Sequence, residues 1–507
     1  MIVTTAQGRL EGLEGDGVWH FRGIPYAAPP VGERRFRPPA PPASWDGVRP
    51  AKEFGSVSWQ GNTGVSLLLG EKGGDASEDC LFLNVTTPAC DDDARPVLVW
   101  IHGGGFMNGS SSSSWYEPTR MASRGDVVVV TVNYRLGALG FLWLGDLDTD
   151  YTSSGVNGLL DQAEALRWVQ QNIAAFGGDP GNVTLFGESA GAMSVSTLLA
   201  LPTARGLFHR VVAQSGAASN TFDRRVAGEI TSSVMNRLGV TELDGLLAVE
   251  PSALSAAAVK VTGEVFHDPG RIAGPTGIAL AMAFQPVVDG EWLPEDPLEA
   301  MRAGTAADVA VVVGSNADEW NLFRLLSPGG LDHPELLDRL DRIFGAGHVI
   351  HDTYAAVRPD AGPDELWSAI LTDATFRIPA VRLLEARAEG GAISPSYQYL
   401  FSWPTPAFGG LVGSCHALEI PFVFGTMESA QAELVLGGST GPELWALSDA
   451  IQDAWLAFAR TGRPSVPRAP AWPAWDREVR SVMRLDTTRE VLSDPSAAER
   501  ELWEGVL

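Results

Sequence analysis

The sequence predicts an α/β fold in which a mostly parallel β-sheet is covered by helices on both faces. Its apolar runs are short and almost unbroken, as in strands that are buried on both sides. Helical patterns lie between several of these runs, most clearly over 158–176, and such alternation is typical of a parallel sheet. The expected strands cover residues 97–102, 127–132, 183–186, 211–215 and 309–314.

The composition indicates a folded protein with a large core. Of the 507 residues, 45% are apolar and 19% are charged, which is typical of globular chains, and we expect one domain over 1–507. The net charge of -26 excludes nucleic acid and anionic lipid surfaces as partners, because nothing would offset the repulsion between like charges.

Three cysteines predict neither a disulfide framework nor a metal site. Cys80, Cys90 and Cys415 cannot all pair within one chain, and their spacing is not that of metal ligands. The amino-terminal residues lack the basic and apolar regions of a signal peptide, and the apolar runs are too short to span a bilayer. A cytoplasmic, reducing location is therefore the expectation.

The remaining segments follow from local composition. Residues 1–60 are rich in proline, which favours antiparallel edge strands and surface loops, and 78–85 predicts another strand. The regions 222–305 and 331–395 have helical composition and are expected to form caps over the strand ends, where α/β sheets place their sites. A long helix over 446–460 is expected to stop at glycine and proline.

Ser189 is the candidate nucleophile. Residues 182–193 give a β-branched run, a glycine-flanked serine and a helical stretch, which is the strand, turn and helix of a nucleophile elbow. Gly187 and Gly191 leave the space that this turn needs, since it forces the serine into a strained backbone conformation. Glu188, inside the turn, has no role that its position predicts.

The same five-residue pattern recurs at 437–441. There Thr440 and Glu443 are interpreted as a capping box of the following helix. This second serine, Ser439, also comes after the candidate acid and base, which inverts the usual chain order. We therefore expect Ser189, and not Ser439, to be the nucleophile.

An oxyanion-binding loop is predicted at 102–106. His102 is followed by three glycines directly after a predicted strand, and bare backbone N–H groups can approach a developing negative charge. The N–H of Ala190, next to the candidate nucleophile, would be a further donor.

A serine nucleophile needs a histidine base and an orienting acid. Among eight histidines, only His416 has a position that fits the order serine, acid, histidine. Asp318 and Glu319 both follow the predicted strand at 309–314, and the residues alone do not choose between them.

These motifs together resemble the type-B carboxylesterase family, which includes cholinesterases and bacterial para-nitrobenzyl esterases. The resemblance extends from about residue 1 to 476. It is carried by residues 21–27, 78–85, 102–106, 133–135, 187–191, 318–319 and 416–421.

The resemblance implies an α/β-hydrolase fold with helical cap insertions. It implies that Ser189 attacks an ester carbonyl, that His416 is the base and that Glu319 is the acid. It further implies oxyanion-hole amides at Gly104, Gly105 and Ala190, a serine at Ser215 that supports the acid, and pocket positions at Leu322 and Phe323.

Two departures from the family pattern concern Cys80 and Trp320. The family usually pairs the first with a cysteine near residues 54–60, where this chain has none, so a buried thiol is expected at Cys80. A tryptophan stands where the family commonly has glycine after the acid, which places a large side chain near the mouth of the site.

The sequence thus predicts a serine hydrolase that cleaves small-molecule carboxylic esters through an acyl-enzyme, without a metal or an organic cofactor. One alternative is the same site acting mainly on thioesters, amides or carbamates. The other is a non-catalytic adhesion relative, although such relatives lack the nucleophile that this chain keeps.

Overall fold

A computed structural model describes residues 1–62, 64, 66, 74–267, 282–326, 330–465 and 470–506. The described residues form an 11-stranded sheet with the order β16-β15-β14-β13-β10-β9-β7-β8-β6-β4-β3. From β15 to β8 neighbouring strands are parallel, and antiparallel strands flank this block at both edges. The strands are β3 (Leu13–Gly15), β4 (Val18–Pro25), β6 (Phe82–Thr87), β7 (Arg95–Ile101), β8 (Val128–Val132), β9 (Gly178–Glu188), β10 (Arg210–Gln214), β13 (Ala310–Asn316), β14 (Ser396–Phe401), β15 (Ser481–Leu485) and β16 (Glu490–Ser493).

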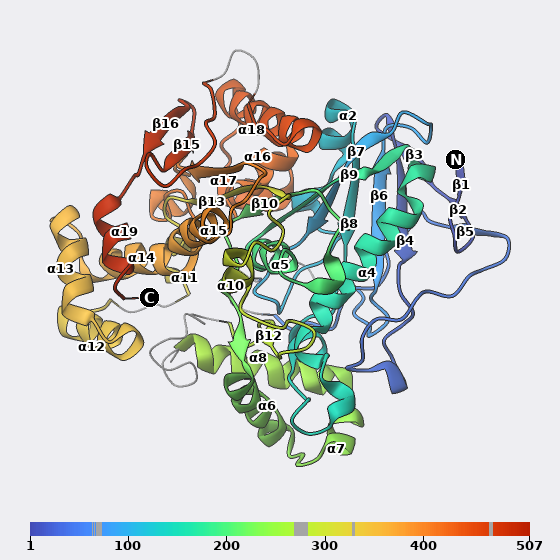
Figure 1. The fold of residues 1–507 in the computed structure, drawn as a ribbon, viewed down its shortest axis with the longest axis horizontal. Helices are drawn as coiled ribbons and strands as arrows, with labels where there is room; N and C mark the ends of the chain where they lie inside the picture. Colours follow the sequence, from blue (N-terminus) through green and yellow to red (C-terminus); the bar gives the residue numbers. More distant parts are fainter. Residues whose placement is uncertain are drawn as a thin grey trace.

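The sheet separates two hydrophobic cores. Side chains of β7 alternate between them: Val97 and Val99 belong to one core, Leu98 and Trp100 to the other. Such alternation follows from the period of two in a strand. The first core includes side chains of α4 (Asn157–Asn172), α5 (Ala190–Leu198) and α15 (Ile378–Glu389). The second includes those of α2 (Thr119–Gly125), α16 (Ile420–Phe424) and α18 (Pro442–Thr461) (Figure 1).

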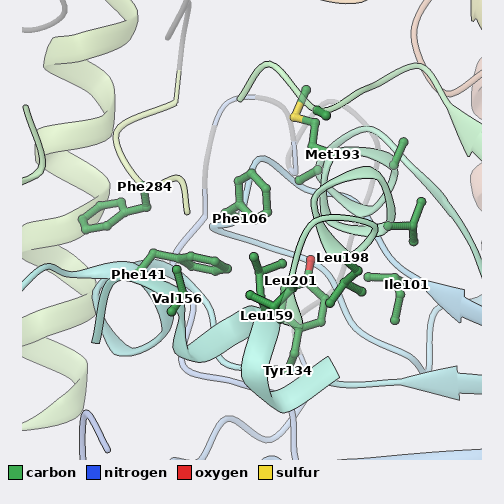
Figure 2. Packing of buried hydrophobic residues seen from close by; sticks show 14 of the residues in the cluster. Ile101, Phe106, Tyr134, Phe141, Val156, Leu159, Met193, Leu198, Leu201 and Phe284 are labelled. Carbon is green, nitrogen blue, oxygen red and sulfur yellow. The ribbon is translucent and has the colours of Figure 1, made fainter. Parts of the chain in front are cut away.

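Packing beneath the elbow fixes the helix that follows Ser189. Figure 2 shows Met193 and Leu198 of α5 among Leu159 of α4, Ile101 of β7 and Phe106 of the glycine-rich loop. All five side chains are buried in the same core. The helix after the nucleophile is thereby anchored to the sheet and to the predicted oxyanion loop.

The two predicted cap regions contain helices, which form separate groups at the periphery (Figure 1). The first group comprises α6 (Arg224–Leu238), α7 (Leu243–Leu247) and α8 (Pro251–His267), with α10 (Pro297–Arg302) near the sheet. The second comprises α12 (His333–Phe344), α13 (Gly347–Val357) and α14 (Pro363–Thr372), which continues into α15; α11 (Asn321–Arg324) precedes this region. Part of the first region, 268–281, lies outside the described residues.

All five predicted core strands are confirmed, with ends that differ by a few residues. The amino-terminal segment contains antiparallel pairs, β1 (Ile2–Thr4) with β2 (Arg9–Glu11) and β3 with β4, and one parallel pair, β2 with β5 (Val48–Pro50). The helix expected over 446–460 is α18, and Gly462 ends it with φ 72°. Across the described ranges, no helix has the length and apolarity to cross a bilayer.

Candidate active site

Ser189 occupies the sharp turn between β9 and α5. Its φ and ψ are 55° and -125°, a region that non-glycine residues rarely adopt and that marks strain at functional sites. A Cβ on Gly191 would lie 2.1 Å from the carbonyl oxygen of Ile101, and one on Gly187 would lie 2.6 Å from the same atom. The expected need for both glycines therefore has a specific cause, which is the end of β7 packed against the turn.

The glycine-rich loop lies against this turn. A Cβ on Gly103 would be 3.0 Å from the Ser189 Cβ, and Gly104 and Gly105 have φ of 108° and 62°. The backbone N–H groups of Gly104 and Gly105 donate no hydrogen bond to any described residue. Ala190 is the first residue of α5, so its N–H has no partner within the helix. Among the described residues these three N–H groups thus have no acceptor, and they lie near Ser189.

His102 holds the start of this loop in place. Its ring stacks on Tyr134 at 4.5 Å, and the Tyr134 hydroxyl donates to the His102 carbonyl at 2.8 Å. Burial lowers the pKa of His102 to about 4. This histidine is therefore neutral at pH 7, and it serves the packing of the loop.

Glu319, and not Asp318, is bound to the candidate base. His416 Nδ1 lies 2.6 Å from Glu319 Oε2, and both side chains are buried. Asp318 Oδ2 instead accepts a hydrogen bond from the backbone N–H of Ser414 at 2.9 Å. The choice that the residues left open is therefore made by geometry, and Asp318 fastens the loop that carries His416.

Glu188 is the residue whose position sequence reasoning missed. Its Oε1 lies 3.1 Å from His416 Nε2, so two carboxylates flank the imidazole. Burial alone would lower the pKa of His416, but Glu188 and Glu319 outweigh burial and raise the pKa to about 9. The only signal in the sequence was a carboxylate beside the candidate serine in a turn of small residues.

A third buried carboxylate, Glu419, lies behind the pair. The Asn316 side-chain amide donates to Glu419 Oε2 at 2.7 Å and to the carbonyl oxygen of Cys415 at 2.7 Å. The Asn316 backbone N–H donates to Glu319 Oε1 at 2.7 Å. Burial, together with the charge of Glu319, raises the pKa of Glu419.

A cavity of about 350 Å³ contains Ser189 and His416 on its wall. One side is aromatic: the ring of Phe323 lies 5.1 Å and that of Phe376 lies 4.8 Å from the ring of His416, and Trp320 packs on Phe323 at 4.8 Å. The cavity is also lined by Gly104, Gly105, Trp115, Glu188 and Thr375. The substitution of tryptophan for the usual glycine thus adds to the wall of the cavity.

Two sequence expectations are not matched by contacts. Leu322 is fully buried in the second core and does not line the cavity, whereas Phe323 does. Ser215 follows β10, next to the elbow, and its N–H donates to the carbonyl oxygen of Gly314 at 2.8 Å. Its hydroxyl has no hydrogen-bond partner among the described residues, so the expected support of Glu319 is not observed.

The second serine motif lies between α17 (Ala430–Leu436) and α18, with no strand before it. Gly441 is the N-cap of α18, and no side chain caps that helix. The predicted capping box of Thr440 and Glu443 is therefore wrong, because the helix begins one residue later than this box requires. Ser439 does not line the cavity.

The cysteines are free thiols, and Cys80 is buried as expected. Burial raises the pKa of Cys80 to about 12 and that of Cys90 to about 11. Within the described ranges, no group of three or more potential ligands is placed to hold a metal ion.

Comparison with known proteins identifies the family of the chain. A model of the family described as "Carboxylesterase family" matches residues 1–503. The chain belongs to the carboxylesterase family. Like the members it resembles, this carboxylesterase is a serine hydrolase of carboxylic esters, as the sequence predicted.

Relatives match over almost the whole carboxylesterase. The para-nitrobenzyl esterase of Bacillus subtilis (strain 168) is 39% identical over 508 residues, covering 99% of this chain and 98% of that protein. The phenmedipham hydrolase of Pseudarthrobacter oxydans is 33% identical, covering 92% and 90%. The crystal structure of a Geobacillus stearothermophilus carboxylesterase at pH 6.2 superposes with a TM-score of 0.87 at 41% identity and covers 99% of each chain. The α/β-hydrolase fold is thereby confirmed.

Proposed function

We propose that Ser189, His416 and Glu319 are the catalytic triad of this esterase, with the amides of Gly104, Gly105 and Ala190 as the oxyanion hole. The observation that carries the proposal is the 2.6 Å contact between His416 Nδ1 and Glu319 Oε2 beside a strained serine that borders the same cavity. A carboxylate on Nδ1 fixes the tautomer in which Nε2 can accept a proton.

The proposed reaction has two halves. The Ser189 hydroxyl oxygen bonds to the ester carbonyl carbon while His416 takes the hydroxyl proton, and the unused amides bind the oxyanion. The carbon–oxygen bond to the alcohol then breaks, and the alcohol leaves with that proton. In the second half, His416 takes a proton from water, the resulting hydroxide attacks the acyl-enzyme, and Ser189 is released with its proton restored.

Glu188 gives the resting site a distinct protonation state. With the pKa of His416 near 9, the imidazole is mostly protonated at pH 7 and is bound between two carboxylates. Nε2 has to lose this proton before it can act as a base, so Glu188 opposes the first half of the reaction at low pH. The same carboxylate stabilises the imidazolium that forms during attack.

We further propose that the substrates are uncharged esters with an apolar or aromatic group. Aromatic side chains line the cavity, among them Trp115, Trp320 and Phe376, and Glu188 together with the net charge of -26 disfavours anions. Two relatives are named for para-nitrobenzyl and phenmedipham substrates. Thioesters, amides and carbamates share the required chemistry, and matched substrates of each class would rank them.

We also propose a domain organisation and a cellular location. We take residues 1–507 as one α/β-hydrolase domain with helical caps, acting in the cytoplasm on small molecules. Support comes from a family match over 1–503 and from the free thiols of the three cysteines.

The test is covalent labelling by an organophosphonate followed by peptide mass analysis. One equivalent should add to the peptide that contains Ser189, and Ser189→Ala should lose label and about 10⁴-fold or more in kcat while its circular dichroism is unchanged. Label on Ser439, or undiminished turnover by Ser189→Ala, would overturn the proposal.

A further inference from the structure

A buried hydrogen-bonded chain connects the C-terminal helix to the wall of the active-site cavity. The helix α19 (Ala497–Trp503) carries Trp503, whose Nε1 donates to the hydroxyl of Tyr354 at 2.8 Å. The Tyr354 hydroxyl donates in turn to Asp373 Oδ2. All three side chains are buried, with 1%, 0% and 5% of their surfaces exposed, so water does not compete for these hydrogen bonds.

Asp373 begins an unusual turn between α14 and α15. Residues Asp373–Arg377 form a π-helical turn, in which the N–H of Ile378 bonds to the Asp373 carbonyl. Pro379 follows and has no N–H for the carbonyl of Thr375, which explains why the α-helical pattern is interrupted here. Single π-turns of this kind are frequent at functional sites.

The two sides of this turn have different partners. On one side, Arg377 binds Asp373 through two hydrogen bonds of 2.6 Å. On the other side, Thr375 and Phe376 line the cavity, and the Phe376 ring packs on His416 at 4.8 Å. The charged pair and the cavity wall therefore belong to one turn of five residues.

The burial of Tyr354 defines the direction of the central hydrogen bond. Burial, reinforced by the charge of Asp373, raises the pKa of Tyr354 well above its ordinary value. The hydroxyl is therefore neutral and acts as both donor to Asp373 and acceptor from Trp503. A phenylalanine at this position would remove both hydrogen bonds and retain the ring.

From this connection we infer that Asp373 is a positioning residue and that Trp503 and Tyr354, acting through it, determine which esters fit beside His416. The C-terminal helix is thereby part of the specificity apparatus, although Trp503 does not line the cavity. The inference rests on the proposed function, because it takes His416 and its cavity as the reaction site.

The test is Tyr354→Phe, assayed on para-nitrophenyl esters of increasing acyl length and on acetates of increasing alcohol size. A wall that is held less firmly admits larger groups, so the ratio of kcat/KM for the bulkiest ester to that for the smallest should rise at least about threefold in one of the series. The kcat for para-nitrophenyl acetate should stay within about twofold. Trp503→Phe removes the outer hydrogen bond together with part of the buried indole, and it should move the ratio in the same direction.

The matched control is Tyr26→Phe. The Tyr26 hydroxyl is also buried and donates to the carbonyl of Asn133 at 2.6 Å, away from the cavity. Thermal melts should show a loss of stability in Tyr26→Phe and Tyr354→Phe alike, but only the latter should change the ratio. Unchanged ratios in Tyr354→Phe and Trp503→Phe, with an active wild type labelled at Ser189, would refute this inference alone; an unlabelled Ser189 would refute the proposed function instead.

Discussion

Glu188→Gln should move the acidic limb of the pH profile to lower pH. The variant keeps the shape of the side chain and removes the charge that lies 3.1 Å from His416 Nε2. At this distance the attraction between unit charges is about 1.3 kcal/mol even with the dielectric constant of water. Because about 1.4 kcal/mol corresponds to one pKa unit, the pKa of His416 should fall by at least about one unit from its value of about 9.

The direction of the shift in the pH profile follows from the role of His416 as the base. His416 has to be neutral to accept the serine proton, so kcat/KM rises as the pH rises through the pKa of the free enzyme. In Glu188→Gln a larger fraction of the enzyme has a neutral His416 below pH 8, so the midpoint of the acidic limb shifts to lower pH. The plateau can fall at the same time, because Glu188 also stabilises the imidazolium, so the midpoint is the quantity to compare.

The assay is kcat/KM for para-nitrophenyl butyrate between pH 5 and 10, with initial rates corrected for spontaneous hydrolysis. Glu242→Gln, which alters an exposed glutamate, is the matched control and should keep the wild-type midpoint. An unchanged midpoint in Glu188→Gln, or a shift to higher pH, would show that Glu188 does not hold the proton on His416.

Three other predictions concern the acid, the elbow and a buried ion pair. Glu319→Gln should lower kcat by about 10³-fold or more, and Asp318→Asn by less than about tenfold, because Glu319 contacts the base and Asp318 does not. Ester turnover measures both effects, and the reverse order would exclude Glu319 as the acid. Gly191→Ala should yield little soluble enzyme, because its Cβ would lie 2.1 Å from a carbonyl oxygen, and a wild-type melting temperature would contradict this. Arg135→Leu should cost about 3–5 kcal/mol in urea unfolding, because it leaves Asp161 buried without its partner at 2.6 Å; a loss below about 1 kcal/mol would argue that Asp161 is neutral.

Local chemistry made most of the fold predictable. The strands β7 to β10 and β13 were visible because they are buried on both faces and therefore read as continuous apolar runs. The strand β14 was not predicted: its residues Ser396–Phe401 mix polar and aromatic side chains. The prediction of a capping box at Thr440 failed because Gly441, and not Thr440, is the N-cap of α18.

The site was predictable where one motif held the relevant residues together. The elbow and the glycine-rich loop are local, so their sequence carries their geometry. The contact of Glu188 with His416 joins residues more than 200 positions apart, and that of Phe376 with His416 depends on a helical turn widened before a proline. The sequence shows a carboxylate beside the serine but nothing that pairs it with His416, and no local pattern indicates the contact of Phe376.

The register of the parallel strands brings the first parts of the site together. Ile101 of β7 pairs with Gly187 of β9, and Glu188 pairs with Gln214 of β10. The glycine-rich loop and Ser189 therefore leave the sheet at nearly the same level. A one-residue slip in either pairing would turn the buried side chains of that strand to the opposite face, so the packing of the two cores enforces this alignment.

His416 does not directly follow a strand, because a long loop separates it from the end of β14. Hydrogen bonds attach this loop to residues 316–319. The N–H of Ser414 donates to Asp318 Oδ2, and the N–H of Asp318 donates to the Ser414 carbonyl, each at 2.9 Å. The Asn316 side-chain amide donates to the Cys415 carbonyl, and the N–H of His416 donates to the Glu319 carbonyl at 3.3 Å. Residues 316–319 thus position the base through its backbone as well as through its ring. Loss of the Asn316 amide should therefore lower kcat more than it raises KM, because it displaces the base and leaves the walls of the cavity in place.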